Sequence, residues 1–326
     1  MGTHEISRGT VRRALDELEF EGRVRRQAGQ GTFITESTPV MHKPCWTLVY
    51  RFRHGESADL QGIESVAEEM GAEVVVEYVA DSRSRFAAAV DRMLAAKAKG
   101  VLIEPLPYEK NTAQVYQPIL DSGMAIVLMH NPVPEVQAPL VACDNELIGK
   151  QITQHLLDMG HRRIGYVASP MYWVIEKQLA GYRAALEAGG VKRRDEWVSL
   201  ESVTSPERGL DATAKLLKLK DPPTAIIALS DETAANAYRA IAAAGLRVPH
   251  DISVVAATGG GPHLSAALSP PLTVWCSGDT AFQMGRTAAH MLHGLIQKTW
   301  PTDANEVFVD PAPVPRGSVA MAPNPG

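Results

Sequence analysis

The sequence has few of the features that mark a secreted, membrane-bound or metal-stabilised protein. It contains only three cysteines, Cys45, Cys143 and Cys276, which lie far apart without a C-x-x-C spacing. Neither a disulfide framework nor a zinc knuckle is therefore expected. No apolar run is long enough to span a bilayer, and the polar N-terminus lacks the apolar core of a signal peptide. These absences predict a cytoplasmic protein with no membrane partner.

Signatures of catalysis and of cofactor binding are also missing. The three glycines at 259–261 are not followed by the Gly-Lys-Ser/Thr of a phosphate-binding loop. His290 and His293 are three residues apart on a predicted helix, but no third metal ligand has a suitable spacing. The chain contains no Gly-x-Ser-x-Gly elbow and no cysteine–histidine signature. We therefore expect no enzyme activity, no cofactor and no metal.

The charge balance limits how this chain can contact nucleic acid. The 326 residues are 45% hydrophobic and 21% charged, as in ordinary globular proteins, and the formal net charge is −5. Such a charge excludes a generally basic surface, so any DNA contact must be local. Six arginines fall between Arg8 and Arg26, which makes the N-terminal segment the candidate.

From residue 47 onward, short apolar runs alternate with segments of helical periodicity. The predicted strands are 47–52, 73–79, 100–104, 124–129, 163–168, 197–201, 224–229, 252–257 and 272–276. The predicted helices are 57–70, 84–98, 111–122, 145–159, 174–189, 206–219, 232–244 and 280–297. This alternation is typical of parallel sheets covered by helices, and the number of strands exceeds one comfortable sheet. The predicted fold class is α/β, with two doubly wound parallel-sheet subdomains.

The N-terminal segment combines a helix pattern with a basic hairpin pattern. Ser7 can cap a helix in which Val11, Leu15 and Leu18 form an apolar stripe. Gly22 suits the left-handed position that ends this helix. The segments 23–27 and 32–34, separated by a Gly-rich turn, predict a β-hairpin. An arginine-bearing helix followed by a basic hairpin can enter the major groove and hold the DNA backbone.

The string SRGTVRRALDELEFEGRVRRQAGQGTFI (7–34) resembles the second half of a GntR-type winged helix-turn-helix. The resemblance implies a partial head, with a recognition helix that opens at Ser7 and a wing tip at 29–31. The implied DNA-binding residues are Ser7, Arg8, Thr10, Arg12, Arg13, Gln27, Gly29, Gln30 and Gly31. Such heads have two further helices, whereas only six residues precede Ser7. A segment this short is not expected to fold unaided or to bind DNA well.

The remaining chain is similar to LacI/GalR-type sensor domains, which share the periplasmic sugar-binding fold. The strings that carry the resemblance occur in the family's order: 141–145, 155–170, 181–190, 223–255, 269–275 and PRGSV at 315–319, which resembles a closing strand. A GntR-type head on this sensor resembles arabinose-responsive regulators. The resemblance implies a homodimer, operator DNA as a partner and a sugar or sugar derivative as the effector.

The candidate effector site lies beyond the carboxyl ends of the predicted strands, where open α/β sheets bind ligands. Aromatic faces and hydrogen-bonding groups suited to a sugar gather there. The predicted effector-binding residues are Arg53, His54, Glu104, His130, Asn131, Asp144, Tyr172, Trp173, Gln178, Asp231, Thr258 and Trp275. Taken singly, most of these residues fit a structural or loop-surface role at least as well.

Three positions depart from the pattern of sugar-binding relatives. Gln178 stands where an arginine usually binds sugar hydroxyls, and Ser230-Asp231 replaces an Asn-Asp pair. Thr258-Gly259 replaces a pair of aspartates. The basic residues Arg53, His54, His130 and Lys177 leave an acidic or phosphorylated sugar as an alternative to a common hexose.

The resulting organisation is a partial DNA-binding segment at 1–34, a linker at 35–46, a sensor at 47–320 and a tail at 321–326. The predicted function is a ligand-responsive transcription regulator. The alternative is an effector-binding, dimerising module that does not bind DNA because its head is truncated.

Overall fold

A computed structural model describes residues 11, 15, 24–27, 31–34, 44–51, 57–107, 112–168, 173–200, 209–259, 262–301 and 305–323. The chain divides into two compact units, Met1–Lys43 and Pro44–Gly326, which are described separately. All candidate effector residues lie in the second unit.

The first unit contains the β-hairpin that the sequence predicts. Strand β1 (Val24–Gln27) pairs antiparallel with β2 (Gly31–Ile34), with Gln27 opposite Gly31 next to the turn. Gly31 has a φ of +116°, a conformation that side chains rarely adopt. Of the predicted helix, the described residues Val11 and Leu15 are helical.

The second unit begins with a lobe built on a six-stranded parallel sheet in the order β13-β7-β6-β5-β3-β4. Its strands are β3 (Cys45–Tyr50), β4 (Glu73–Tyr78), β5 (Gly100–Ile103), β6 (Ala125–Met129), β7 (Leu140–Cys143) and β13 (Glu306–Val309). Its helices are α2 (Ala58–Glu69), α3 (Arg83–Ala95), the 3₁₀ helix η1 (Thr112–Tyr116), α4 (Gln117–Ser122) and α10 (Gly278–Gln297). We call this the N-lobe.

The other lobe, the C-lobe, is built on a five-stranded parallel sheet in the order β12-β11-β10-β8-β9. Its strands are β8 (Ile164–Ala168), β9 (Val198–Leu200), β10 (Ala225–Ser230), β11 (Ser253–Thr258) and β12 (Thr273–Cys276). Its helices are α5 (Asn145–Asp158), α6 (Trp173–Ala188), the short η2 (Asp195–Trp197), α7 (Leu210–Leu217), α8 (Asp231–Ala243) and α9 (Pro262–Ala267). The predicted class, two parallel-sheet α/β subdomains, is confirmed.

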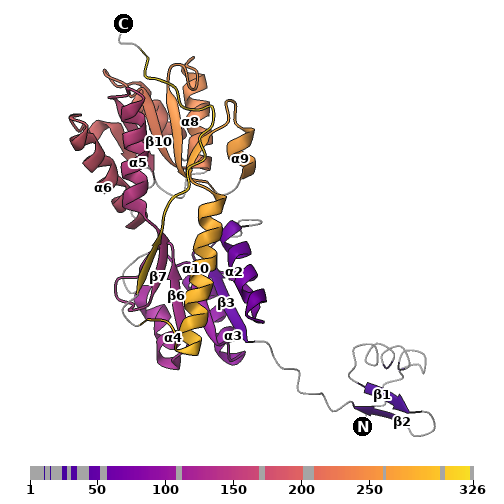
Figure 1. The fold of residues 1–326 in the computed structure, drawn as a ribbon. Helices are drawn as coiled ribbons and strands as arrows, with labels where there is room; N and C mark the ends of the chain where they lie inside the picture. The colour runs from indigo at the N-terminus through magenta and orange to yellow at the C-terminus, as the bar shows by residue number, and fades with distance from the viewer. Residues whose placement is uncertain are drawn as a thin grey trace. The chain divides into compact units, whose positions relative to one another are not determined.

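The chain crosses between the lobes three times, as Figure 1 shows at the waist of this unit. It passes from β7 into α5 and from β12 into α10. After β13 it returns to the C-lobe, where Val314 forms a bridge with Val274 of β12. Side chains at these crossovers are therefore positioned to respond to a change in the angle between the lobes.

Each lobe contains one helix pair held at very short separation by glycine. In the N-lobe, a Cβ added at Gly285 of α10 would lie 2.0 Å from the carbonyl oxygen of Asp59 on α2. In the C-lobe, a Cβ at Gly149 of α5 would lie 2.0 Å from the carbonyl oxygen of Gln178 on α6. Only glycine permits these backbone contacts. The α2–α10 contact also fixes the position of Asp59 at the edge of the N-lobe.

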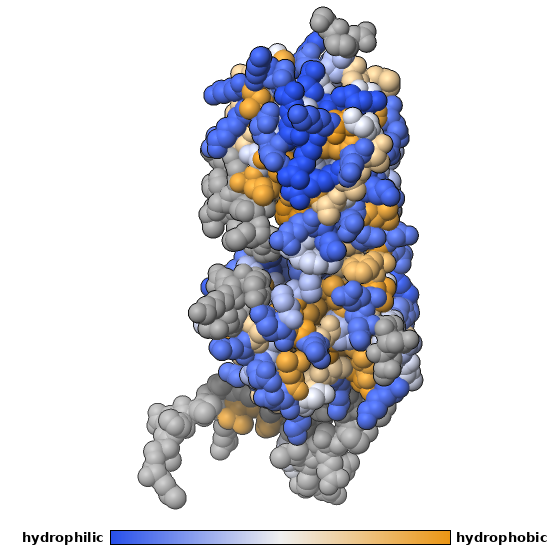
Figure 2. Space-filling view, turned by 90° about the vertical axis from the view of Figure 1, so that its left-hand side faces the viewer, coloured by the Kyte–Doolittle hydropathy of each residue, from blue (hydrophilic) through white to orange (hydrophobic). Residues whose placement is uncertain are grey.

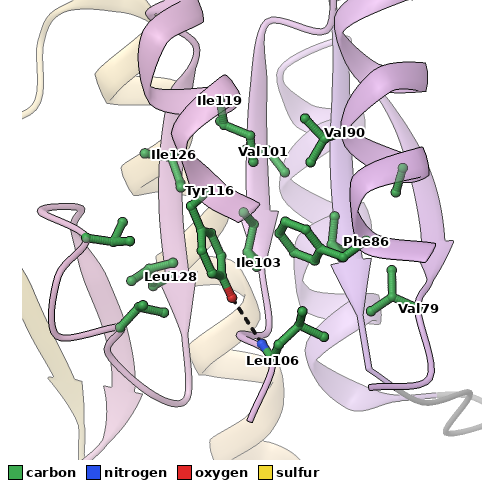
Figure 3. Close-up of a cluster of buried hydrophobic side chains, with 14 of the residues drawn as sticks. Val79, Phe86, Val90, Val101, Ile103, Leu106, Tyr116, Ile119, Ile126 and Leu128 are labelled. Atoms are coloured by element: carbon green, nitrogen blue, oxygen red, sulfur yellow. Dashed lines mark hydrogen bonds between the residues drawn. The ribbon is translucent and has the colours of Figure 1, made fainter. Parts of the chain in front are cut away.

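One face of the N-lobe sheet is covered by a tightly packed apolar cluster (Figure 3). The rings of Phe86 and Tyr116 meet at 4.9 Å between centroids. The backbone N–H of Leu106 donates a hydrogen bond of 3.1 Å to the Tyr116 hydroxyl. Burial raises the pKa of Tyr116 to about 12, although this hydrogen bond by itself lowers it, so the hydroxyl stays neutral.

Both ends of α5 carry residue types that are typical of helix caps. The Asp144 carboxylate accepts from the backbone N–H of Leu147 at the start of α5, and Gly160, with a φ of +85°, follows the end of that helix. His161 then lies fully buried, with its ring nitrogens 2.9 Å from the Thr224 hydroxyl and 3.2 Å from the Ser253 hydroxyl. His161 therefore has a structural role in the turn after α5.

Several predictions about individual elements were wrong. Strands β7 and β13 and helix α9 are not among the predicted elements, because runs of four to six residues carry little periodic signal. Segment 315–319 is not a strand; hydrogen bonds to β11 and β12 hold it, among them the bond of 2.6 Å that the Ser318 hydroxyl donates to the carbonyl oxygen of Val254. The predicted helix 111–122 is a 3₁₀ turn followed by α4, with Pro118 near its start. The last two linker residues, Cys45 and Trp46, belong to β3.

No helix among the described residues is long and apolar enough to cross a membrane. On the face shown in Figure 2, hydrophobic residues are interspersed with hydrophilic ones rather than gathered into a belt.

Candidate effector pocket between the two lobes

A pocket of about 280 Å³ lies at the crossovers, where the carboxyl ends of the strands of both sheets meet. The N-lobe, the C-lobe and the crossover segments all contribute to its walls. The lining residues are Tyr50, Ser57, Ala58, Asp59, Glu104, His130, Cys143, Asn145, Val174, Thr258, Gly259, Cys276, Ser277, Gly278, Ala281 and Met284. Its size suits a small ligand, and its polar groups come from several different strands and helices.

The central charged feature of the pocket is a contact between Asp59 and His130. Asp59 lies in the first turn of α2 and His130 follows β6, and their Oδ2 and Nε2 atoms lie 3.3 Å apart. His130 has a φ of +68°, an uncommon conformation for a residue with a side chain. The Asp59 side chain is 6% exposed and the His130 side chain 34% exposed.

This pair shifts the titration of both partners. Burial raises the pKa of Asp59, but the hydrogen bond and charge of His130 outweigh it, so the net pKa is lowered. Burial lowers the pKa of His130, but the hydrogen bond and charge of Asp59 outweigh it, so the net pKa is raised. Asp59 is therefore ionised at neutral pH, and protonated His130 is favoured beside it.

Further polar groups surround this pair on the N-lobe side. The Ser57 hydroxyl donates a hydrogen bond to Asp59. The pKa of the Tyr50 hydroxyl is raised, first by burial and then by the negative charge of Asp59. Glu104 accepts a 3.1 Å hydrogen bond from the backbone N–H of Arg51. Among the described residues, the buried Ser277 hydroxyl has no hydrogen-bond partner. A ligand hydroxyl could pair with Ser277 without displacing a protein contact.

The opposite wall is ordered by a buried hydrogen-bond chain. Asn145 lines the pocket, and its Oδ1 accepts a 2.9 Å hydrogen bond from Nε2 of Gln178. Gln178 in turn accepts from the Tyr166 hydroxyl at 2.6 Å. Asn145 also donates to the carbonyl oxygen of Cys143 at 3.0 Å. Gln178 therefore fixes the orientation of the Asn145 amide.

The sequence-predicted effector residues do not all converge on this pocket. Glu104, His130 and Thr258 line it. The fully buried Gln178 lies behind it, and Trp275 is buried in the C-lobe core with Nε1 donating to Gln151 at 2.9 Å.

Two other predicted residues line neither pocket that the structure describes. Asp231 is 4% exposed at the start of α8, where its Oδ1 accepts from the backbone N–H of Glu232 at 2.9 Å. Asn131 has a buried Oδ1 without a hydrogen-bond partner in the described chain.

Two predicted residues lie in a second pocket, of about 350 Å³, next to the first. Asp144 and Trp173 line it together with Lys177 and Phe308. The Trp173 ring stacks on Phe308 with a centroid distance of 6.2 Å and an interplanar angle of 17°. Because Trp173 belongs to α6 and Phe308 to β13, this contact links the two lobes.

The remaining site predictions fall outside the described residues or on their edge. Gln27 and Gly31 flank the turn of the β1–β2 hairpin. Those outside are Arg53, His54 and Tyr172 for the effector, and Ser7, Arg8, Thr10, Arg12, Arg13, Gly29 and Gln30 for DNA. They stay predictions.

Sequence reasoning missed the acidic centre of the pocket. Neither Asp59, in the first turn of α2, nor Ser277, at the N-cap of α10, is among the residues predicted from sequence. The strand-end rule would have found Ser277, which directly follows β12, had it been applied to every strand. Within the described chain, no group of three or more histidine, cysteine or acidic side chains could hold a metal ion.

Two parallel-sheet lobes joined by three crossovers, with a polar pocket at the hinge, define a ligand-binding domain of the periplasmic binding protein type. The chain belongs to the family described as "Periplasmic binding protein-like domain", which matches residues 153–319.

Comparison with individual proteins adds three similarities. The chain is 26% identical to the arabinose metabolism transcriptional repressor of Geobacillus stearothermophilus, over 96% of this chain and 88% of that protein. It is 35% identical to the HTH-type transcriptional repressor PurR of Mannheimia succiniciproducens, but over 56% of this chain and only 53% of that protein. The structure of a transcriptional regulator CelR–cellobiose complex aligns with a TM-score of 0.73 at 25% identity, covering 97% of this chain and 93% of that one.

Proposed function

We propose that this chain is a ligand-responsive transcription regulator, in which residues 47–320 bind a sugar-like effector and residues 1–34 contribute to DNA binding. The observation that carries the proposal is the polar pocket at the hinge. A ligand that contacts both of its walls has a different affinity for each lobe angle and therefore shifts the population of lobe arrangements. The arabinose repressor and the CelR–cellobiose complex support this assignment, because both align over nearly the whole chain.

The pocket chemistry favours a neutral polyol as effector. The ionised Asp59 can accept hydrogen bonds from ligand hydroxyls, and Ser277 offers an unused hydroxyl. Asn145 presents an amide that is already oriented by Gln178. Carboxylate and amide groups of this kind, held in place by their neighbours, bind adjacent sugar hydroxyls well.

A phosphorylated sugar fits the described lining less well. The described residues that line the pocket include two carboxylates, Asp59 and Glu104, and no lysine or arginine. Of the basic residues that suggested an anionic ligand, His130 is paired with Asp59 inside the pocket, and Lys177 lies in the second pocket, 3.5 Å from Glu146, whereas Arg53 and His54 lie outside the described residues. A phosphate would therefore meet like charge.

The effector assignment can be tested by calorimetric titration of the full chain. Arabinose, ribose and cellobiose would be compared with their phosphorylated counterparts. We expect a neutral sugar to bind, and Asp59→Asn to weaken it by about 10- to 100-fold, since hydrogen bonds to charged groups contribute about 1.5–3 kcal/mol. Asp91→Asn, which removes an exposed carboxylate of α3, is the matched control. Preferential binding of the phosphorylated sugars would refute the neutral-polyol assignment.

For DNA binding, we propose that residues 7–22 form the recognition helix of a winged helix-turn-helix and that the β1–β2 hairpin is its wing. The antiparallel pairing of Val24–Gln27 with Gly31–Ile34 supports this reading of the second half. In a homodimer, two such heads would contact the half-sites of a palindromic operator. An effector-driven change in lobe angle would alter head spacing, and a coupling of about 1–3 kcal/mol would change operator affinity 5- to 150-fold.

The DNA-binding proposal is tested by selecting duplexes from a random palindromic library and measuring their affinity between 50 and 200 mM salt. For a protein that makes about six to ten phosphate contacts, this rise in salt lowers the affinity about 10³- to 10⁵-fold. We expect salt-dependent binding by a dimer, with loss in Arg8→Ala/Arg12→Ala. The control Arg85→Ala/Arg183→Ala removes two exposed sensor arginines and the same charge. Sugar binding without any DNA binding would instead favour a sensing module.

A further inference from the structure

We propose that Cys143 and Cys276 form a reversible disulfide that responds to peroxide and staples the hinge between the two lobes. The Sγ atoms of these residues lie 3.2 Å apart, although 133 positions separate them in the chain. Both residues line the effector pocket, so the pair lies beside a cavity that a small oxidant can enter.

The position of the pair gives the disulfide its mechanical effect. Cys143 is the last residue of β7, immediately before the chain enters the C-lobe at α5. Cys276 is the last residue of β12, immediately before the chain returns to the N-lobe at α10. A bond between them would join two of the three crossovers directly. Movement of one lobe on the other requires these segments to shift, so the bond would restrict it.

The geometry requires only a small adjustment to form the bond. A disulfide has an S–S length of about 2.05 Å, so the sulfurs must approach by roughly 1 Å. That distance is within reach of a modest side-chain rotation at each residue. Cys45, the third cysteine, begins β3 and lines neither of the two pockets, so it offers an internal control.

The surroundings distinguish the attacking thiol from the resolving thiol. The hydrogen bond from Cys143 lowers the pKa of Cys276; burial opposes this, and Thr280 and the nearby charge of His130 add to the lowering. Cys143 is affected in the opposite direction, because that hydrogen bond and burial raise its pKa. Since the thiolate is the nucleophile, Cys276 attacks first.

The reaction balances with hydrogen peroxide as oxidant. The Cys276 thiolate attacks one peroxide oxygen, the O–O bond breaks, and a sulfenic acid forms; the hydroxide that leaves takes up the proton that the Cys276 thiol had lost and becomes water. The Cys143 sulfur then attacks the sulfenic sulfur, the S–O bond breaks, and a second water leaves. Two thiols are oxidised to one disulfide while one peroxide is reduced to two waters. In the cytoplasm, disulfides of this kind are transient and serve redox sensing.

The bond is tested on the full-length chain by peptide mapping without reduction, before and after equimolar hydrogen peroxide. We expect a cross-linked 143–276 peptide, a fall from three titratable thiols to one, no covalent dimer, and full reversal by dithiothreitol. Cys143→Ser and Cys276→Ser should each abolish the cross-link, and Cys45→Ser should retain it. Three unchanged thiols, cross-linking through Cys45, or sulfinic acid at Cys276 without a disulfide would each overturn the proposal.

Hinge stapling is tested by hydrogen–deuterium exchange on the same samples, which requires neither effector nor DNA. We expect amides at 143–147 and 276–281 to exchange at least about threefold more slowly after oxidation, and Cys143→Ser to show no change. Equal exchange in a protein with the bond mapped would refute stapling. Because both readouts are independent of regulation, failure of the proposed function would leave this inference standing.

Discussion

The close contact between α2 and α10 makes Gly285→Ala the sharpest single test of the N-lobe. The added Cβ would lie 2.0 Å from the carbonyl oxygen and 2.7 Å from the carbonyl carbon of Asp59, whereas ordinary contacts begin near 3.4 Å. The obstruction is helix backbone, so no side-chain rotation can relieve it. The two helices must therefore separate by roughly 1 Å or more, and α2 would carry Asp59 out of the pocket.

The magnitude follows from two opposing terms. Overpacking a well-packed contact costs about 1–3 kcal/mol, and a backbone obstruction belongs at the upper end. Replacing glycine by alanine inside a helix returns about 1 kcal/mol of intrinsic propensity. We therefore expect a net loss of about 1–2 kcal/mol in the free energy of unfolding.

The control is Gly278→Ala, the same change at the start of the same helix. A Cβ there would lie 3.9 Å from its nearest neighbour, the Cβ of Ala58, so stability should stay within about 0.5 kcal/mol of the parent chain. Urea unfolding followed by circular dichroism gives the comparison, with the midpoint and slope fitted together. A Gly285→Ala chain as stable as the Gly278→Ala chain would show that the helices do not meet as described.

Three further changes test buried groups around the site and core. Gln178→Met keeps the side-chain volume but leaves the hydrogen-bonding groups of Tyr166 and Asn145 unpaired. We expect the free energy of unfolding, measured in urea, to fall by about 2–4 kcal/mol. An unchanged free energy would show that this amide does not order the pocket wall. Tyr116→Phe leaves the buried N–H of Leu106 without its acceptor, so the free energy of unfolding should fall by about 1–3 kcal/mol in the same assay. No change would mean that this hydrogen bond does not form. The His130–Asp59 pair should stabilise the fold only within a window of pH. Because the pKa of His130 is raised, the stabilisation by the pair is complete below about pH 6.5 and is lost as the pH rises through the folded-state pKa of His130. Because the pKa of Asp59 is lowered, the stabilisation is present above about pH 3.8 and is lost as the pH falls through the folded-state pKa of Asp59. The difference in melting temperature between the parent chain and His130→Gln should therefore be largest between about pH 3.8 and 6.5 and shrink as the pH rises through the folded-state pKa of His130, and a difference independent of pH would contradict the pairing.

Local signals allowed much of the fold to be predicted from sequence. The alternation of apolar runs and helical periods predicted nine strands, each of which overlaps a strand in the structure. Helix ends were also predictable, because caps such as Asp144 and Gly160 act through hydrogen bonds and backbone angles within a few residues. The shortest elements, β7, β13 and α9, escaped because four to six residues do not establish a period.

The composition of the pocket could not be predicted in the same way. Asp59 and His130 are 71 positions apart, and Cys143 and Cys276 are 133 apart, so only the sheet order and the crossovers bring them together. Gln178 shows the converse: its place in the sequence suggested a ligand contact, but the packing of α6 against α5 buries it behind the pocket.

The sequence by itself determined the alternating α/β elements, their caps, and the hairpin at residues 24–34, since these depend on short-range hydrogen bonding and periodicity. The tertiary structure decided which strand ends face one another across the hinge, because that depends on the path of the chain through three crossovers. The side chains of the acidic pocket and of the thiol pair are brought together only by that path.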